Sequence, residues 1–471
     1  MKPESLFSSK LPRSHRRTTV PAPILQKQLW FFEHSPLGSA MERIASAAQS
    51  SRTPTQVQYP ARQPASASRF VLSVLLVAGA AHAEDNSLGS RSTLTGDWGG
   101  VRSELQENGV NLGLESTTFY QGGLKGDGRK HFDASTRVDG FFNLDLEKLG
   151  LWQGGGLNGH IEYRGDNMQN FRGGAILPVN SGTMLPLNSG NELEATSLYL
   201  SQALGERTSL LLGKINAVDL LAGDPFFGGW GSQRFWNLAF VAPPNGIVPA
   251  VMMGGLLSHS TGPYTFNALV FDPTDQTDKY ALNHLFSSGT AMQLSAGWAG
   301  ALDGRATSAT LAATYSTKGG SDLGELDLPP DSRSEDKSSS RSVSLQLNHL
   351  ILESQQLEGK GLGIYALSAI NDGNPNPIKS SFAGGLAGHG MVPGRHNDSF
   401  GLGYFYYNFS SDLKSTLKPI LNLGSEQGME VYYNAALTPW LILGGDLQWL
   451  EPALERKDRA VVGGLRLRVI Y

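Results

Sequence analysis

The last stretch of the chain, Gly464 to Tyr471, constrains the fold more than any other segment. Two faces alternate along it, with Leu465, Leu467, Val469 and Tyr471 on one and Arg466, Arg468 and Ile470 on the other. A period of two is typical of a β-strand whose faces meet different surroundings. A dry core does not accept two unpaired arginines, whereas lipid on one side and a watery lumen on the other suit both faces. The alternative is an amphipathic strand of a soluble β-protein, and this stretch alone leaves both open.

The same alternation recurs in the interior of the chain. Val138–Glu147 and Leu157–Asp166 each predict a strand, and in the second the charged residues Glu162, Arg164 and Asp166 fall on one face. Three charges on one face are too many for a dry core but suit a lumen. A soluble sheet with one wet face explains a single strand of this kind equally well, but it explains a series of them poorly. Further strands are expected at 264–270, 292–298 and 343–348, and a hairpin at 197–214.

The composition agrees with a membrane barrel. Only 17% of the 471 residues are charged, against about 25% in typical soluble domains. No run of about 18 apolar residues occurs, so a helical membrane protein is excluded. Barrel strands escape this criterion because polar lumen residues dilute their hydropathy. The chain has no cysteine, which excludes disulfides and cysteine-ligated metals.

A targeting segment is expected at 69–83. Arg69 precedes a short apolar core, Phe70–Ala78, and Ala81-His82-Ala83 has the small residues of a cleavage site. These features predict a secretory signal peptide cleaved after Ala83; the alternative is a buried segment of a soluble domain. Residues 1–68 are rich in Ser, Arg, Pro and Gln. We expect them to be disordered or a mis-assigned extension, with translation starting nearer the signal, at Met41.

Export changes the charge balance of the mature chain. Residues 1–83 hold ten basic and three acidic residues, which leaves 28 basic and 39 acidic residues in 84–471, a net charge of −11. This balance argues against a nucleic-acid partner. It does not define selectivity, which depends on where the charges lie in a lumen.

A short periplasmic segment, 84–109, is expected before the barrel. Val101 and Leu105 are four residues apart, as on one face of a helix, and Asn108-Gly109 is a typical helix stop. These signals predict a helix over 99–107, followed by the first strand at 110–120.

Two parts of the chain resemble the carbohydrate-selective porins (OprB family) of Gram-negative bacteria. The N-terminal part is Leu94–Val110, with Thr95-Gly96-Asp97-Trp98-Gly99-Gly100 and then Arg102, Leu105 and Gly109. The C-terminal part comprises Leu437-Thr438-Pro439-Trp440, Asp446, Gln448, Pro452 and Gly463–Tyr471. The middle matches more loosely, and Tyr471 stands where the family commonly has Phe. The resemblance implies an outer-membrane barrel for sugar diffusion, and a closing strand that ends on an aromatic residue resembles the assembly signal of such barrels.

The predicted connections come in two sizes, as in a barrel with short periplasmic turns and long outer loops. Trp152–Gly156 and Thr438-Pro439 are short turns, and Glu451–Asp458 is an outer loop. Long connections are predicted at Gly165–Asn191, Asn216–Pro249, Lys318–Arg341 and Asn371–Asn397. We therefore expect an all-β fold over 110–471, a transmembrane antiparallel β-barrel of about 16 strands, with 18 as the alternative.

The candidate site is the lumen of this barrel. The loop Asp224–Asn237 holds five aromatic residues, an arginine and two amides, which suit the apolar ring faces and hydroxyls of sugars. We expect the loop to fold inward, with Trp230, Arg234 and Trp236 in contact with the sugar; alternatively, it packs at the rim or contacts lipopolysaccharide. Seven further residues are predicted to line the pore: Glu162, Arg164, Asp166, Asp446, Gln448, Arg466 and Arg468.

The expected function is transport. The sequence contains no catalytic motif and no metal-ligand spacing, so we expect no enzyme, no cofactor and no bound metal. We expect a porin for facilitated diffusion of carbohydrates, namely glucose-like monosaccharides and small sugars. The alternatives are a porin for amino acids or organic acids and a plugged structural or adhesive barrel. Expected partners are sugars, outer-membrane lipid and lipopolysaccharide, and the barrel assembly machinery through the strand that ends at Tyr471.

Overall fold

A computed structural model describes residues 87–471, apart from residues 129, 166–167, 169, 185–191, 281, 329–331, 334–336 and 358. The expected extension, the start at Met41, the signal peptide with cleavage after Ala83, and the pore residue Asp166 lie outside the described residues. Within the described part, no helix is both long and apolar enough to cross a bilayer.

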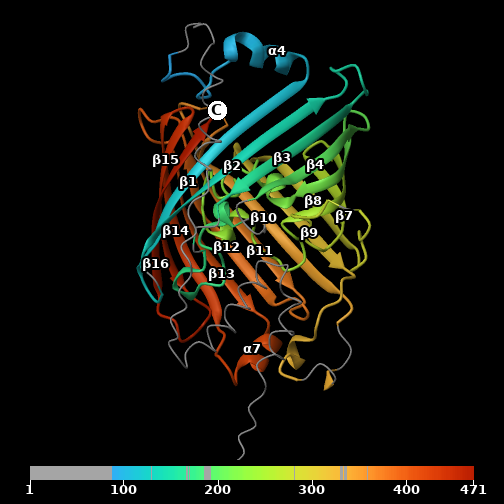
Figure 1. The fold of residues 1–471 in the computed structure, drawn as a ribbon, viewed down its shortest axis with the longest axis vertical. Coiled ribbons are helices and arrows are strands. Elements are labelled where there is room, and N and C mark those ends of the chain that lie inside the picture. Colours follow the sequence, from blue (N-terminus) through green and yellow to red (C-terminus); the bar gives the residue numbers. More distant parts are fainter. Residues whose placement is uncertain are drawn as a thin grey trace, which may run out of the picture.

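Sixteen strands of the described chain close into one antiparallel barrel (Figure 1). Each strand pairs with its neighbours in the sequence, and the last strand pairs with the first. The prediction of a 16-stranded barrel from residue 110 is confirmed. The strands are β1 Val110–Lys125, β2 Phe132–Asp145, β3 Gly155–Arg164, β4 Leu193–Ala203, β5 Thr208–Asn216, β6 Val251–Thr261, β7 Tyr264–Phe271, β8 Ala291–Leu302, β9 Arg305–Ser316, β10 Ser340–Glu353, β11 Gly361–Asn371, β12 Ile378–His389, β13 Ser399–Phe409, β14 Ser425–Thr438, β15 Leu441–Glu451 and β16 Ala460–Ile470.

The helices are short and lie in the connections. At the N-terminal end, the 3-10 turn η2 leads into α4, as the helix signals predicted. The described helical segments are η2 Trp98–Gly100, α4 Val101–Glu107, η3 Arg172–Gly174, η4 Ser181–Thr183, α5 Ala217–Leu221, α6 Leu238–Val241, η5 Leu323–Glu325 and α7 Ser411–Leu417.

The closing strand β16 has the predicted register. Leu465 and Leu467 are 55% and 42% exposed on the outer face, whereas Arg466 is 1% exposed on the inner face. Thr118 of β1 pairs with Leu467, which seals the barrel. A slip of one residue would invert these faces, so the two arginines and the two leucines fix the pairing together.

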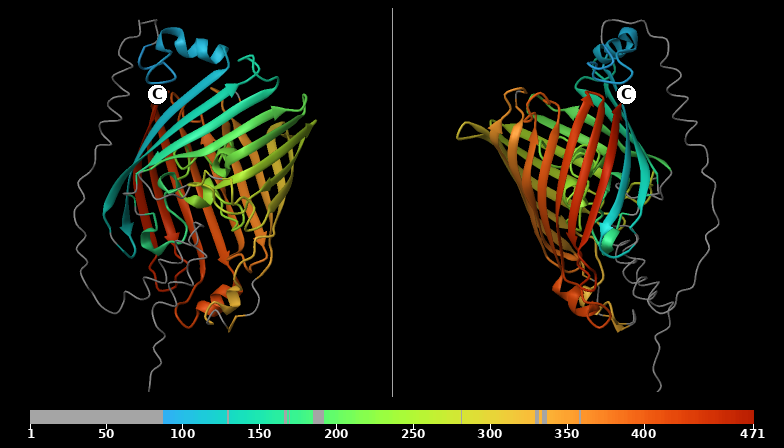
Figure 2. Two further views of the ribbon diagram at one scale, coloured as in Figure 1. Left: turned by 45° about the vertical axis from the view of Figure 1, so that its right-hand side comes forward. Right: turned by 90° about the vertical axis from the view of Figure 1, so that its left-hand side faces the viewer.

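The two ends of the barrel differ. The short turns, α4 and Tyr471 lie at one end, and the long loops with α7 lie at the other (Figures 1 and 2). The predicted loop Asn371–Asn397 is wrong, because the strand β12 occupies its centre. Three glycines, Gly384, Gly385 and Gly388, weaken the strand signal of this segment. Two further long connections, 272–290 and 410–424, were not predicted.

The N-terminal segment is attached to the closing strand. The backbone N–H of Leu94 donates to the carbonyl oxygen of Ile470 at 2.7 Å. Arg102 of α4 lies 4.5 Å from the centre of the Trp98 ring and donates to the carbonyl oxygen of Tyr471 at 2.8 Å. The motif that carries the family resemblance therefore holds the end of β16.

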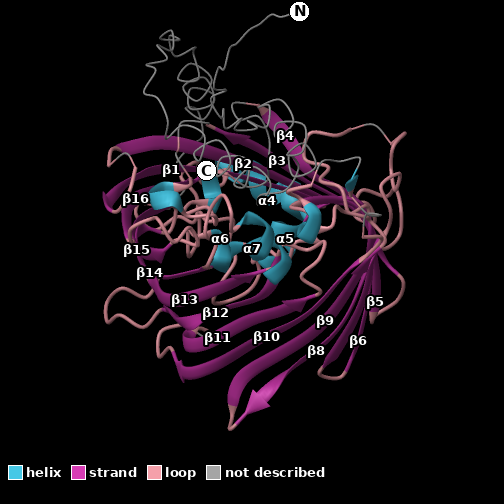
Figure 3. Cartoon of the chain, turned by 90° about the horizontal axis from the view of Figure 1, so that it is seen from below, coloured by secondary structure: helices cyan, strands magenta, loops and turns pink. Residues whose placement is uncertain are grey.

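The buried core of the protein lies inside the barrel, because the outer face of the strands is exposed. The loop 217–250 and the described segment 170–184 fold into the lumen, and Figure 3 shows α5 and α6 within the ring of strands. Their apolar residues pack against inward-facing aromatic side chains of β11, β13 and β14. The aromatic members of this cluster are Phe226, Phe227, Phe235, Phe240, Tyr365, Phe405, Tyr407, Phe409 and Tyr432.

Candidate functional site

The inward loop 217–250 is held by a glutamate on the barrel wall. Glu430 of β14 accepts hydrogen bonds from the backbone N–H groups of Trp236 and Asn237, and its side chain is fully buried. Asn237 in turn caps α6 through the N–H of Ala239 at 3.0 Å and donates to Gln448 at 3.1 Å. The barrel wall at β14 and β15 thus fixes both the aromatic segment and α6, the helix that follows it.

A second glutamate holds the second loop in the same way. Glu426, four residues before Glu430 and on the same face of β14, accepts hydrogen bonds from the N–H groups of Ile176 and Leu177, both at 2.7 Å. The sequence analysis missed both glutamates. The signal was present, because Glu426, Gly428, Glu430, Tyr432 and Asn434 alternate with outward-facing residues.

The pore residues predicted on β15 and β16 face the lumen, but they bind the loops. Arg466 donates to the carbonyl oxygens of Gly231 and Arg234 at 2.6 and 3.0 Å. Gln448 donates to the carbonyl oxygen of Val179 at 2.8 Å and to Asp446 at 2.8 Å. Most of the hydrogen-bonding groups of Arg466 and Gln448 are therefore bonded to the protein itself.

Arg468 has a different partner on the first strand. It forms a two-pronged ion pair with Glu115 of β1, with nitrogen–oxygen distances of 2.6 and 2.8 Å. Both side chains keep about 15% exposure. This pair joins β16 to β1 across the seam of the barrel.

The predicted residues Glu162 and Arg164 belong to a buried network on β2 and β3. Glu162 lies 3.2 Å from Arg137 and 3.6 Å from Arg164, and it accepts hydrogen bonds from Thr196 and Asn216 at 2.8 and 3.0 Å. The charges predicted for this strand are thus present in the lumen. They are paired with one another and covered by the loops.

His160 connects this network to the inward loop. Its ring nitrogens lie 3.0 Å from Asp139 and 2.9 Å from Asp219, the residue at the centre of α5. Asp219 also accepts a hydrogen bond from the indole N–H of Trp230 at 2.7 Å. The wall therefore positions Trp230 through two side chains.

Asp139, His160 and Glu162 also have the atoms of a metal site, since their potential ligand atoms lie within 4.8 Å of one another. However, the guanidinium of Arg137 lies 2.7 Å from Asp139 and 3.2 Å from Glu162. It supplies the positive charge that the two carboxylates need. We interpret the cluster as an ion-pair network.

The three predicted sugar contacts differ in accessibility. Trp236 is fully buried, with its ring edge-on to Phe119 at 5.2 Å and the Arg466 guanidinium 5.2 Å from its centre. The prediction that Trp236 stacks on a sugar is wrong, because the apolar ring packs on the wall instead of facing water. Trp230 and Arg234 remain partly exposed, and their contact with a sugar stays a prediction.

The far end of the aromatic segment reaches another part of the wall. The Asp224 carboxylate accepts hydrogen bonds from Gln346 at 3.0 Å and Asn348 at 2.6 Å, both on β10. The loop 217–250 is therefore attached to β10 on one side and to β14, β15 and β16 on the other. It crosses the lumen.

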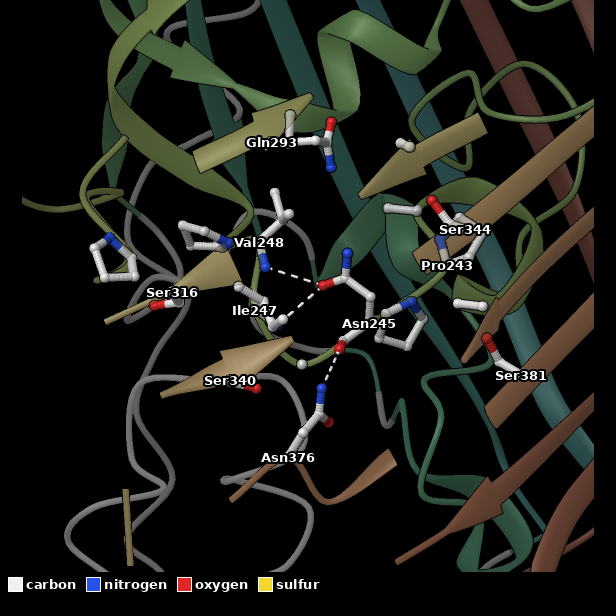
Figure 4. A pocket seen from close by; sticks show the side chains of 18 of the residues that line it. Pro243, Asn245, Ile247, Val248, Gln293, Ser316, Ser340, Ser344, Asn376 and Ser381 are labelled. Atoms are coloured by element: carbon white, nitrogen blue, oxygen red, sulfur yellow. Dashed lines mark hydrogen bonds between the residues drawn. The ribbon is translucent and has the colours of Figure 1, made fainter. Parts of the chain in front are cut away.

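A cavity of about 480 Å³ lies between this loop and the wall of β8 to β12 (Figure 4). The loop contributes mainly apolar groups, among them Leu220, Leu221, Pro243, Pro244, Ile247 and Val248. The wall contributes hydroxyls and amides, among them Gln293, Ser295, Thr310, Ser344, Gln346 and Ser381, together with apolar side chains such as Met252, Leu269 and Leu367. No residue of the predicted segment Asp224–Asn237 lines the cavity; α5, α6 and the segment after them do.

Only two of the described residues that line this cavity are charged, Asp275 and Lys318. Burial raises the pKa of Asp275 and lowers the pKa of Lys318. Both shifts favour the neutral form. Most of the charge in the lumen is thus in the loop attachments, and little of it faces the open space.

A closed antiparallel barrel with an inward-folded loop that narrows its lumen defines the porin class. The sequence profile of the carbohydrate-selective porin, OprB family, matches residues 130–471, and the chain belongs to this family. Its N-terminal motif, Thr95 to Gly100, lies before the matched range. Family and barrel together imply the outer membrane as the location.

Solved structures agree with the fold. The high-pH structure of Pseudomonas putida OprB shares 20% identity, covers 82% of this chain and 100% of its own, and superposes with a TM-score of 0.71. The low-pH structure of the same protein shares 17% identity, covers 81% and 99%, and gives a TM-score of 0.52. At these identities the likeness shows the fold alone. No individual curated protein matches the chain.

Proposed function

We propose that this porin carries out facilitated diffusion of glucose-like monosaccharides and small sugars into the periplasm. The observation that carries the proposal is the mixed lining of the cavity. The loop supplies apolar groups such as Leu221 and Val248, and the wall supplies hydroxyls and amides such as Ser344 and Gln293 beside apolar side chains such as Leu367. A sugar offers weakly apolar ring faces and a rim of hydroxyls, so it satisfies both sides with contacts weak enough to release it.

The charge distribution favours neutral solutes over the alternative substrates. A channel for organic acids or amino acids needs fixed charges that face the passage. In this lumen Arg466 donates to loop carbonyl oxygens, and Arg137 is paired with carboxylates. A plugged barrel is disfavoured by the size of the cavity, about 480 Å³. In this proposal the chain acts as a channel and not as an enzyme.

Liposome swelling tests the proposal. Purified protein in liposomes is challenged with glucose, maltose, arginine and succinate at equal osmotic strength. We expect glucose to give the fastest swelling, followed by maltose. Faster swelling with succinate or arginine than with glucose would instead support a porin for charged solutes.

We also propose the route to the membrane. Export through the signal peptide at 69–83 is followed by insertion through the barrel assembly machinery, which recognises β16 and Tyr471, and the outer rim contacts lipopolysaccharide. Amino-terminal sequencing of the exported protein should begin at Glu84. A terminus upstream of Glu84 contradicts cleavage after Ala83.

A further inference from the structure

The segment after α6, Pro243–Pro249, lines the cavity (Figure 4). We call it the strap. Three of its seven residues are prolines, which fix φ. The side chain of Asn245 accepts hydrogen bonds from the N–H groups of Ile247 and Val248 at 2.9 and 3.0 Å. These bonds fix the conformation of the turn from within, whereas its position in the lumen depends on contacts outside it.

One residue of the wall fastens the strap. Asn376, in the connection between β11 and β12, donates from its side-chain amide to the carbonyl oxygen of Asn245 at 2.6 Å. Its own oxygen accepts the N–H of Ile378 at 3.0 Å, and it is only 2% exposed. A Cβ atom at Gly246, where φ is +76°, would lie 2.3 Å from the oxygen of Asn376. The strap and this asparagine thus fit without a gap.

The connection that carries Asn376 is held from its other side as well. Asn374 donates to Asp322 at 2.7 Å and to Asp412 at 2.9 Å, and it accepts the N–H of Leu323 at 3.1 Å. These partners lie at η5 and α7. The connection therefore has two separate attachments, one to η5 and α7 through Asn374 and one to the strap through Asn376.

We propose that the strap, fastened by Asn376, sets the largest neutral solute that the channel admits. The proposal rests on the proposed sugar function and deepens it. The strap, Asn376 and the wall residues Gln293 and Ser344 line one cavity, so the strap forms the wall opposite the hydroxyls and amides. Pore diameter sets a size limit only if the wall cannot move, and Asn376 supplies the contact that prevents movement.

The first test measures size selectivity. Liposome swelling is recorded with glucose, maltose and maltotriose for the wild type and for Asn376→Ala. We expect the maltotriose-to-glucose rate ratio to rise about threefold or more in the variant, because a released strap widens the passage. Asn374→Ala is the matched control, since it removes outer contacts and keeps the bond to the strap. An equal rise in this control would assign the effect to the whole connection and overturn the proposal.

The second test works in one folded protein. The chain has no cysteine, so Gly246→Cys with Asn376→Cys gives a unique pair, and the added Cβ at 246 lies 2.7 Å from the Asn376 side-chain carbon Cγ. We expect the protein with the oxidised cysteine pair to keep the wild-type maltotriose-to-glucose rate ratio. With the pair reduced, this ratio should rise as in Asn376→Ala. Identical ratios in both states would refute the strap as the size limit. A wild type that passes no sugar would refute the sugar function. A wild type that passes glucose, together with identical ratios in the two states of the cysteine pair, would refute the strap alone.

Discussion

The buried carboxylate of Glu430 and the backbone N–H of Trp236 are hydrogen-bonded across 194 positions of the sequence. The side chain adds a second bond to Asn237 at 3.0 Å. A carboxylate that accepts two N–H groups satisfies loop donors that would otherwise lie buried without a partner. This contact places the aromatic segment on the wall and leaves the opposite side of the lumen open.

Glu430→Ala should release the inward loop. It leaves two buried N–H groups unsatisfied, at about 1–3 kcal/mol each. We expect a lower unfolding temperature and a larger, noisier single-channel conductance in planar bilayers. Glu426→Ala is the matched control, because it also removes a buried glutamate of β14 but releases residues 176–177 and leaves the loop 217–250 attached. Unchanged conductance in Glu430→Ala would show that the loop needs no attachment to β14.

Trp236→Ala should act on stability and not on sugar binding. The ring is fully buried against Phe119 and Arg466, and removal of a buried Trp costs about 3–5 kcal/mol. The temperature at which the folded band is lost in heat-modifiability gels should fall. Trp230→Phe keeps an aromatic ring and removes the indole N–H bond to Asp219, so this temperature should fall less in that variant. If Trp236→Ala kept wild-type stability but sugar reduced the channel conductance less than in the wild type, Trp236 would be a sugar contact after all.

The contacts of Asp322 beside η5 should loosen in strong acid. Hydrogen bonds from Lys337, Asn374 and the N–H of Gly324 hold the pKa of Asp322 at about 2. Because the folded-state pKa is below the ordinary value, this stabilisation is complete above about pH 4 and is lost as pH falls through about 2. Pepsin cleavage near η5 should therefore accelerate between pH 4 and pH 2. Asp322→Asn should remove this pH dependence, and an unchanged profile would contradict the assignment.

Arg102→Ala should weaken the attachment of the N-terminal segment to the end of β16. The guanidinium loses its bonds to Tyr471 and Thr93 and its contact with Trp98, a loss of about 1–3 kcal/mol. We expect a lower transition temperature for the folded barrel in membranes. Glu104→Ala on the exposed face of α4 is the control.

Tyr471→Asp should impair insertion and leave protein in the periplasm. The phenol of Tyr471 pairs with Ser116 at 3.0 Å, and its N–H donates to Leu114. Aspartate removes both the aromatic ring that belongs to the interfacial girdle of such barrels and the hydroxyl bond to Ser116. Cell fractionation measures the result, and normal amounts of folded barrel in the outer membrane would contradict it.

The barrel could be predicted from the sequence because its signal is local. Alternation with period two in segments such as 465–471 needs no knowledge of the partner strand. The signal weakened where glycines replace β-branched residues, and β12 was therefore taken for part of a loop. The direction in which Arg466 and Gln448 point was predicted correctly, since it follows from the same alternation.

The role of these lumen residues could not be predicted in the same way. Arg466 and Gln448 bind backbone carbonyl groups of Gly231 and Val179, which are more than 200 residues away. Every residue has such a carbonyl, so no side-chain pattern identifies the partner. For the same reason the aromatic segment was expected to face the solute, and the cavity beside the strap went unrecognised.

The attachments of the inward loops come from both ends of the chain. His160 on β3 holds Asp219, while Glu430 on β14 and Arg466 on β16 hold the segment around Trp236. These strands become neighbours around the lumen only when β1 meets β16. A barrel in which β1 has not yet paired with β16 therefore lacks the attached loops that narrow its lumen. Closure of the barrel and the setting of its permeability happen in the same step.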